Sequence, residues 1–473
     1  SRNSITEALS NIIWAPLSKG LSGVSLSANW MWPCNNEGED SRLYDAVESI
    51  SKFAIELGIN VPTGKDSLSM KQKYPTKEVI APGTVIISAA AECNNISNVI
   101  EPLFKIDQGS IYYINLSQDK YKLGGSSFAQ TLNKVGNETP SVTSAEFIVK
   151  VFNTVQNLMA NGLIVAGHDV SAGGLITTLC EMCFSDNNVG ADLVLDSLNE
   201  EDSIKLLFSE NAGLVIQSKD DFIEDYFKKD NIEFFKIGKT SKSDNLTIKN
   251  FNENIDLKIS EYRDEWFSTS VLLDKKQTSN NLAIERFNNF KNQPLKFVFP
   301  AKFNGIVPVI DSSINRPKAA IIREKGSNSE REMANAMYLA GFDVKDIHMT
   351  DLISGRENLE DIRFIGTVGG FSNSDVLGSA KGWAGAFRYN EKAKSSLENF
   401  MKRKDTLSVG ICNGCQLFME LDLINPEHEI HGKMTFNDSK KHESAFTSVK
   451  IQKNNSIMLS SLEAVSYTHL TLP

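Results

Sequence analysis

The chain has 473 residues, more than a single hydrophobic core usually organises, and its 49 basic against 59 acidic residues give a formal net charge of −10. This charge argues against binding to nucleic-acid backbones, six irregularly spaced cysteines argue against a disulfide-stapled secreted scaffold, and no stretch approaches the roughly 20 apolar residues of a membrane span. Together these features predict a multidomain cytoplasmic enzyme with no nucleic-acid partner and no membrane partner.

The first 260 residues are predicted to alternate between helices and strands. Apolar residues at helical spacing predict a helix over residues 43–57 that ends at Gly58. The apolar, β-branched stretch 79–91 predicts a buried strand with a turn at Pro82-Gly83. A second unit is predicted to begin near Gly109, with a strand at 111–114, a helix at 145–160, and strands near 213–217 and 234–237.

A glycine-rich segment of this second unit, Gly167-His-Asp-Val-Ser-Ala-Gly-Gly-Leu175, follows apolar residues and precedes a helical stretch. Its glycines would let the backbone approach a phosphate, the helix N-terminus would add N–H donors, and Asp169 offers a hard oxygen ligand for magnesium. The same turn could also be purely structural.

Periodicity fades between about residues 262 and 315, where Asn, Lys and Phe accumulate, which predicts a linker with some helix in it. From Lys318 a third unit alternates strands with helices. Its strands are expected at 319–322, 344, 364–368 and 407–411, and its first helix at 329–340. Strands separated by helices predict right-handed crossovers and a doubly wound parallel sheet.

The last of these strands leads into Cys412, which has Gly410 and Gly414 at i−2 and i+2 and a helical stretch after it. Small flanking residues permit the strained strand-to-helix turn that presents a nucleophile at the end of a sheet. The N-terminus of the following helix favours the thiolate, which is the reactive form.

Two other interpretations apply to Cys412 and Cys415. Zinc binding would need a second ligand pair, for which His428 and His431 are the nearest candidates. A thioredoxin-like redox pair would leave the flanking glycines unexplained.

A glycine pair lies one crossover earlier, in Val368-Gly-Gly-Phe-Ser372, at a predicted strand end. The backbone N–H groups of Gly369, Gly370 and Phe371 could form the oxyanion hole needed when a thiolate attacks an amide. A Gly-Gly turn after a strand is also common without such a role.

The cysteine segment resembles class I glutamine amidotransferases, whose motif Gly-x-Cys-x-Gly-x-Gln is matched at Gly410, Cys412, Gly414 and Gln416. The resemblance implies that Cys412 is the nucleophile and that Gln416 contacts the substrate glutamine. It also implies a catalytic His and Glu two residues apart beyond residue 473. The adjacent His442-Glu443 does not fit that spacing, so the triad is expected to be incomplete here.

The remainder of the chain resembles the aminoimidazole ribonucleotide synthetase-like superfamily, in its phosphoribosylformylglycinamidine synthase branch. The matching segments, besides 167–175, are Glu7-Ala-Leu-Ser-Asn11, Ser27-Ala-Asn-Trp-Met-Trp32, Pro62-Thr-Gly-Lys-Asp-Ser-Leu-Ser-Met70, Ala81-Pro-Gly-Thr-Val85 and Phe208-Ser-Glu-Asn-Ala-Gly-Leu214. The glutaminase opening matches from Arg316, with departures at Lys325, Ser327 and Asn373, so the resemblance covers residues 1 to about 465.

This resemblance implies roles for six residues of the synthetase part. Glu7, Asn11 and Asp169 are implied magnesium ligands, Ser171 is an implied contact of ATP or ADP, and Lys65 and Asp66, in a glycine-rich turn, are implied phosphate contacts. The i, i+4 spacing puts Glu7 and Asn11 on one helix face. Without the resemblance, that face would be interpreted as a solvated helix surface. Lys65 could equally be a surface lysine that faces solvent.

The implied fold is α/β and α+β, in several domains. Synthetase-like N- and C-domains are expected at residues 1–105 and 106–260, a linker at 261–315, an incomplete, doubly wound class I glutaminase domain at 316–465, and a non-native tail at 466–473.

The implied activity is the ATP- and glutamine-dependent conversion of formylglycinamide ribonucleotide to formylglycinamidine ribonucleotide in purine biosynthesis. Ammonia would pass between domains, and a further N-terminal synthetase half would be a partner absent from this chain. One alternative is a noncatalytic scaffold that binds MgADP without turnover. Another is a stand-alone ATP-dependent ligase fused to an unrelated cysteine domain, against which the motifs from Arg316 onward argue.

Overall fold

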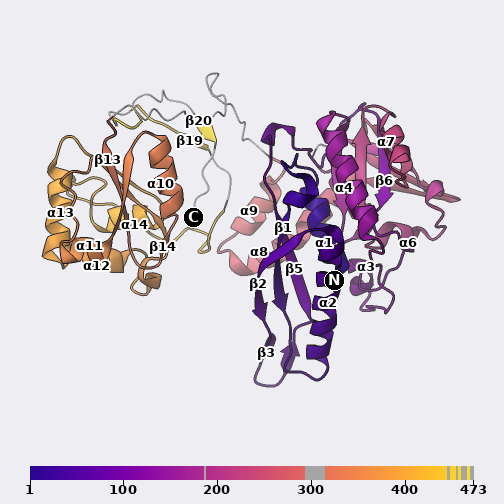
Figure 1. Cartoon of the computed structure of the whole chain (residues 1–473), viewed down its shortest axis with the longest axis horizontal. Helices are drawn as coiled ribbons and strands as arrows, with labels where there is room; N and C mark the ends of the chain where they lie inside the picture. Colours follow the sequence, from indigo (N-terminus) through magenta and orange to yellow (C-terminus); the bar gives the residue numbers. More distant parts are fainter. Residues whose placement is uncertain (186–187, 293–314, 445–447, 454–455, 460–465, 469–473) are drawn as a thin grey trace. The chain divides into compact units, whose positions relative to one another are not determined.

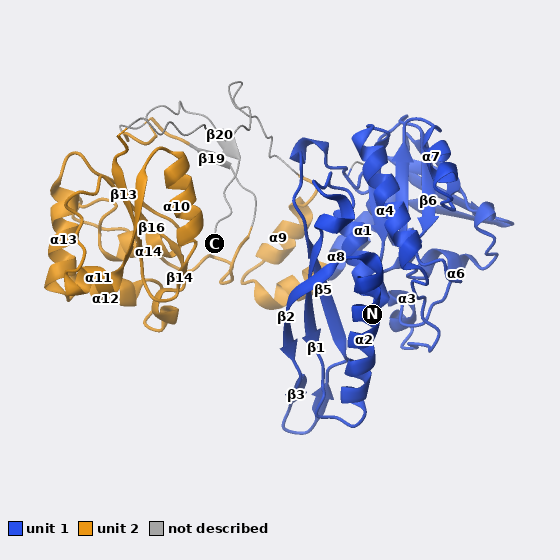
Figure 2. Ribbon diagram, in the orientation of Figure 1, with its two compact units in different colours: residues 1–269 blue, residues 270–473 orange. Residues whose placement is uncertain are grey.

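The computed structural model describes residues 1–185, 188–292, 315–444, 448–453, 456–459 and 466–468. The chain forms two compact units, residues 1–269 and 270–473, coloured separately in Figure 2. Within the described ranges no helix has both the length and the apolar character needed to cross a bilayer.

Unit 1 begins with a three-stranded sheet and two helices. The strand order is β2 (Asn60–Ser67), β1 (Ser25–Met31), β5 (Thr84–Ala90), with β1 parallel to β2 and antiparallel to β5 (Figure 1). Helices α1 (Arg2–Ile12) and α2 (Glu39–Leu57) share one apolar core with β1. The predicted helix over 43–57 is confirmed, and it ends at Gly58 in the left-handed conformation, with φ 71°.

The predicted buried strand at 79–91 is wrong in its burial and its extent. The structure has a short β4 (Glu78–Ile80), paired with β3 (Lys71–Lys73), and then β5. Alternate residues of β5 are exposed, and Ile86 is 50% exposed. The helices of unit 1 leave this face of the sheet uncovered, and apolar sequence alone does not report which face is covered.

A seven-stranded sheet forms the rest of unit 1. Its order is β12 (Glu253–Lys258), β11 (Asn245–Asn250), β8 (Gly190–Val194), β10 (Phe235–Ser241), β6 (Ser110–Asn115), β9 (Gly213–Ser218), β7 (Ile164–Val170). One face packs on α4 (Ala145–Ala160) and α7 (Ile223–Lys229), and the other on α5 (Gly174–Glu181) and α6 (Ser203–Phe208). Because both faces are covered, β9 is buried along its whole length. The predicted strands at 111–114, 213–217 and 234–237 and the predicted helix at 145–160 are confirmed.

The exposed side chain of Asp221 is hydrogen-bonded to two neighbouring strands of this sheet, β10 and β6. Asp221 accepts hydrogen bonds from Lys236 Nζ and from the Tyr112 hydroxyl, each at 2.7 Å. The bond from Lys236, and then that from Tyr112, lower the pKa of Asp221 to about 2. Since the folded pKa lies below the ordinary 3.8, this contribution to stability is present above about pH 4 and is lost as pH falls through about 2.

We therefore expect Asp221→Asn to destabilise unit 1 at pH 7 by no more than about 1 kcal/mol, because the carboxylate is largely solvated. The difference from wild type should disappear near pH 2, and urea unfolding at both pH values measures it. Asparagine keeps the acceptor for Tyr112, so an equal difference at both pH values would contradict the ionic explanation.

Unit 2 contains a four-stranded parallel sheet in the order β15 (Asp343–His348), β13 (Lys318–Arg323), β16 (Phe364–Thr367), β18 (Leu407–Gly410). Alternate residues of β13 point to two cores. One core contains residues of α10 (Glu330–Leu339), and the other contains residues of α11 (Met349–Ser354), α12 (Lys381–Arg388), α13 (Glu391–Lys402) and α14 (Asn413–Glu420). Helices on both faces confirm the predicted doubly wound fold.

The described part of the predicted linker contains two helices, α8 (Ile259–Gln277) and α9 (Leu282–Asn289). The rest of it, 293–314, lies outside the described residues. Near the other end, β19 (Ser448–Lys450) pairs with β20 (Ser466–Thr468), which begins the predicted non-native tail, and residues 469–473 lie outside the described part. The predicted domain boundaries stay predictions.

Candidate functional site

Cys412 occupies a strained turn between β18 and α14. It is exposed, caps α14, and has φ 55° and ψ −114°, a conformation that side-chain-bearing residues rarely adopt. A Cβ at Gly410 would lie 2.5 Å from the carbonyl oxygen of Gly414, and a Cβ at Gly414 would lie 2.2 Å from that of Thr367. Both glycines are therefore required by space, which is the geometry that the sequence predicted.

Buried Asn413 connects this turn to Ser372, two residues after the glycine pair at 369–370. Its Oδ1 accepts a hydrogen bond from Ser372 Oγ at 2.6 Å, and its Nδ2 donates to Gln416 Oε1 at 2.9 Å. A side chain at Gly369 would meet Cys412 Cβ at 3.2 Å, so the glycine pair lies directly beside Cys412. Sequence reasoning missed Asn413, although a polar residue between Cys412 and Gly414 was a usable signal.

Two predicted oxyanion donors require correction. In β17 (Gly369–Gly370), which pairs with β14 (Ser327–Asn328), the following residue Phe371 donates its N–H to the carbonyl of Gly326 at 3.0 Å. That N–H is already engaged, so Phe371 does not have the free donor that the sequence predicted. Gly369 is the hydrogen-bonded partner of Asn328 in this short ladder, so its N–H is engaged as well, and Gly370 is left as the candidate donor.

The alternative roles of the cysteines gain no support. Cys412 and Cys415 are both free thiols, and His428 is exposed. Among the described residues, no group of three or more His, Cys, Asp or Glu side chains is arranged to hold a metal ion. Glu443 binds Arg286 at 2.8 Å, so its carboxylate has a partner other than the adjacent His442.

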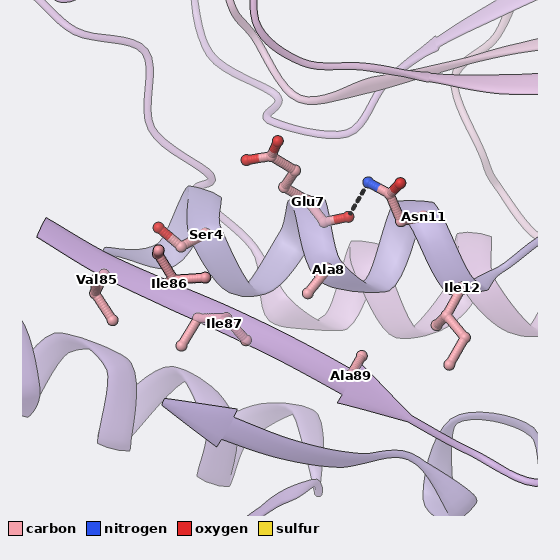
Figure 3. Close-up of a pocket in the computed structure, with 9 residues that line it drawn as sticks. All are labelled: Ser4, Glu7, Ala8, Asn11, Ile12, Val85, Ile86, Ile87 and Ala89. Atoms are coloured by element: carbon pink, nitrogen blue, oxygen red, sulfur yellow. Dashed lines mark hydrogen bonds between the residues drawn. The ribbon is translucent and has the colours of Figure 1, made fainter. Parts of the chain in front are cut away.

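In unit 1 the predicted magnesium ligands come together at α1. Glu7 and Asn11 lie on the same side of α1 and line a pocket that α1 shares with β5 (Figure 3). Asn11 Nδ2 donates to the Glu7 carbonyl at 3.0 Å and to Asp169 Oδ2 at 3.2 Å. Asp169 is only 6% exposed, at the end of β7, so residues 158 positions apart in sequence meet here.

A cavity of about 280 Å³ lies beside Glu7. Its walls include Ser171, Gly124, Gly125 and Glu210. Ser171 was predicted, but the glycine pair and Glu210 were missed. The Gly-Gly-Ser turn at 124–126 before the short α3 (Ser127–Thr131), and the position of Glu210 in a matching segment, were the available signals.

The electrostatics at Glu7 fit a divalent cation. Partial burial of its carboxyl, with the charges of Asp169 and Glu210, raises the pKa of Glu7. Carboxylates that repel one another are relieved by a hard cation, and the amide oxygen of Asn11 is a suitable third ligand if its side chain turns. Together these oxygens suit magnesium, although they do not form a closed ligand set.

Lys65 and Asp66 were predicted to lie in a glycine-rich turn. In the structure they lie on the exposed strand β2. Gly64 allows β2 to approach β1, since a Cβ there would lie 2.2 Å from the Ala28 carbonyl oxygen. Neither Lys65 nor Asp66 lines the cavity beside Glu7 and Ser171. Gly64 therefore allows the pairing of β2 with β1. The sequence pattern alone does not distinguish such a glycine from one in a phosphate-binding turn.

Three family models match successive parts of the chain. Residues 1–92 match the FGAR-AT PurM_N-like domain, residues 116–249 the C-terminal domain of AIR synthase related proteins, and residues 316–470 the CobB/CobQ-like glutamine amidotransferase domain. The last match includes the first residues of the predicted non-native tail.

Curated relatives match across 98% of the chain. They are a probable phosphoribosylformylglycinamidine synthase, chloroplastic/mitochondrial, of Arabidopsis thaliana (39% identity), a probable one of Caenorhabditis elegans (37%) and that of Homo sapiens (34%). The chain spans 34%, 37% and 36% of these relatives, about a third of their length. Thermotoga maritima PurL complexed with FGAR aligns at 13% identity over 55% of this chain and 42% of that one, with a TM-score of 0.41.

Proposed function

Since the chain belongs to the family of phosphoribosylformylglycinamidine synthases, we propose that it contributes to the ATP- and glutamine-dependent conversion of formylglycinamide ribonucleotide to formylglycinamidine ribonucleotide. The observation that carries the glutamine half of this proposal is Cys412, exposed in a strained turn at a helix N-terminus. The part of the proposal that concerns ATP and formylglycinamide ribonucleotide is supported by sequence identity to the curated relatives across 98% of the chain.

In the proposed glutaminase step, the Cys412 thiolate attacks the side-chain carbonyl carbon of glutamine, with Gln416 as a contact of the substrate. The carbonyl oxygen becomes an oxyanion, which the N–H group of Gly370 stabilises. Collapse of the intermediate breaks the C–N bond, the leaving nitrogen takes a proton and departs as ammonia, and water then hydrolyses the thioester to glutamate. The resemblance to class I glutamine amidotransferases implies a His and Glu pair that moves these protons, and the ammonia is proposed to pass to the synthetase part.

For unit 1 we propose binding of ATP or ADP with magnesium at the cavity beside Glu7. Glu7, Asn11 and Asp169 would hold the cation, and Ser171 would contact the nucleotide. When bound, magnesium neutralises phosphate charge. Asn11 fixes the Asp169 carboxylate through the 3.2 Å bond, and the burial of Asp169 limits competing water.

A specific observation favours the second candidate, a scaffold that holds nucleotide without turnover. Glu7 and Glu210 are the charged side chains in the wall of the cavity, and Lys65 is not part of it. Phosphoryl transfer depends on positive groups that stabilise the transferring phosphoryl charge. We therefore propose that this chain by itself binds MgADP and does not hydrolyse ATP.

Calorimetric titration with MgADP tests the nucleotide site. We expect Asp169→Asn to weaken binding at least about tenfold, because loss of one charged ligand removes about 1.4 kcal/mol or more. Asp45→Asn, which changes an exposed carboxylate of α2, is the control and should bind as wild type does. Equal affinities of Asp169→Asn and wild type would reject the site, and phosphate release from ATP would reject the scaffold role.

We also propose a cytoplasmic location, on the composition of the chain. One relative is named for chloroplasts or mitochondria, so organelles are the competing location. Fractionation of the source cells, followed by immunodetection, distinguishes the two.

A further inference from the structure

Glu210 joins two turns that are 46 residues apart in sequence. Its Oε1 accepts the backbone N–H of Ser127 at 2.7 Å and that of Gly173 at 2.9 Å. Ser127 is the first residue of α3, and Gly173 precedes α5 with φ 85°. A single carboxylate oxygen thus satisfies N–H groups at the starts of two helices, which the helices themselves leave without intrahelical partners.

Both turns contribute residues to the wall of the cavity beside Glu7. Gly124 and Gly125 precede Ser127, and Ser171 and Ala172 precede Gly173. A Cβ at Gly124 would lie 2.3 Å from the Glu138 carbonyl oxygen, so this turn is packed closely against its own loop. Glu210 connects the two turns directly by hydrogen bonds to both.

The backbone around Glu210 is held in place independently. Asn211, which is 1% exposed, donates from Nδ2 to Ser117 Oγ at 2.8 Å and to the Asp119 carbonyl at 3.1 Å. Ser209 is also buried. Because its neighbours are fixed, Glu210 has a defined position from which its carboxylate reaches both turns.

We propose that Glu210 is a positioning residue that sets the spacing of the two glycine-containing turns and so determines whether the cavity admits a nucleoside diphosphate. This inference rests on the nucleotide site proposed above. The two hydrogen bonds need an acceptor oxygen at this position, which a glutamine amide of the same length supplies as a carboxylate does. Their loss would leave two amides unpaired in a partly buried wall, which costs more than the bonds contribute when formed.

Three substitutions separate position from charge. Glu210→Gln keeps the reach and the acceptor oxygen but removes the charge, Glu210→Asp keeps the charge but shortens the reach by one methylene, and Glu210→Ala removes both. Glu201→Ala, an exposed glutamate of the same unit, is the control. Each variant of the full chain is measured by amide hydrogen exchange at Ser127 and Gly173 without nucleotide, and by calorimetric titration with MgADP.

We expect Glu210→Gln to leave exchange at both amides within about threefold of wild type and to bind MgADP with similar affinity. Glu210→Asp and Glu210→Ala should speed exchange at both amides by at least about tenfold and weaken MgADP binding at least about tenfold, equivalent to about 1.4 kcal/mol. The control should match wild type in both measurements.

The opposite order, with Glu210→Gln impaired and Glu210→Asp intact, would overturn the positioning role and show that charge is what matters. Unchanged exchange in Glu210→Ala would also overturn it. If wild-type protein bound no MgADP, the proposed nucleotide site and the admission of nucleotide would both be rejected, while exchange at the two amides would still decide whether Glu210 holds the turns.

Discussion

Cys412→Ala is expected to abolish glutamine-dependent synthesis, with a loss of at least about 10³-fold, in protein that also contains the remaining parts found in relatives of this family. Without the thiolate no thioester forms. The ammonia-dependent reaction, which bypasses glutamine, should stay within about twofold of wild type. Product formation with each nitrogen source measures both.

The isolated chain allows a parallel test with an electrophilic glutamine analogue and peptide mass spectrometry. Label should fall on Cys412 and disappear in Cys412→Ala. Cys415→Ala and Cys93→Ala, which remove a partly exposed and an exposed thiol, are the matched controls and should still be labelled at Cys412. Equal labelling of Cys412 and Cys93 in wild type would show that the turn confers no special reactivity.

Gly414→Ala is expected to destabilise unit 2 by about 2–3 kcal/mol or more. The added Cβ would lie 2.2 Å from the Thr367 carbonyl oxygen, which is backbone of β16 and has no rotamer by which to move away. Either α14 or β16 must shift, and both lead into the site, so reactivity of Cys412 should fall as well. Urea unfolding followed by ¹⁹F NMR of fluorotryptophan at Trp383 measures unit 2 separately from unit 1.

Gly385→Ala is the matched control for that experiment. It changes a glycine of α12 in the same unit, where the nearest atoms to an added Cβ, on Tyr389, lie at 3.8 Å. Alanine there should be neutral or stabilising by about 0.5–1 kcal/mol, because it restricts the unfolded chain. If Gly414→Ala unfolded at the same urea concentration as wild type, the close packing of α14 on β16 would be disproved.

The sequence alone determined the parallel sheet of unit 2 and the turn at Cys412. Both depend on local patterns: apolar strands alternate with helices, and Gly410 and Gly414 bracket the cysteine where close backbone contact excludes larger residues. The helix at 43–57 was predicted for the same reason, because its apolar residues recur at helical spacing. Glu7 and Asn11 were identified through resemblance to a family, since their spacing alone suits any exposed helix face.

Only the tertiary structure decided which faces are covered and which polar groups are already paired. The exposed face of β5, the exposed strand that holds Lys65, and the engagement of the Phe371 N–H by Gly326 all contradicted local expectation. Glu210 was likewise found only through its bonds to Ser127 and Gly173. Apolar periodicity reports that a face can be buried, but the covering element and the hydrogen-bond partner come from distant parts of the chain, and only folding brings them together.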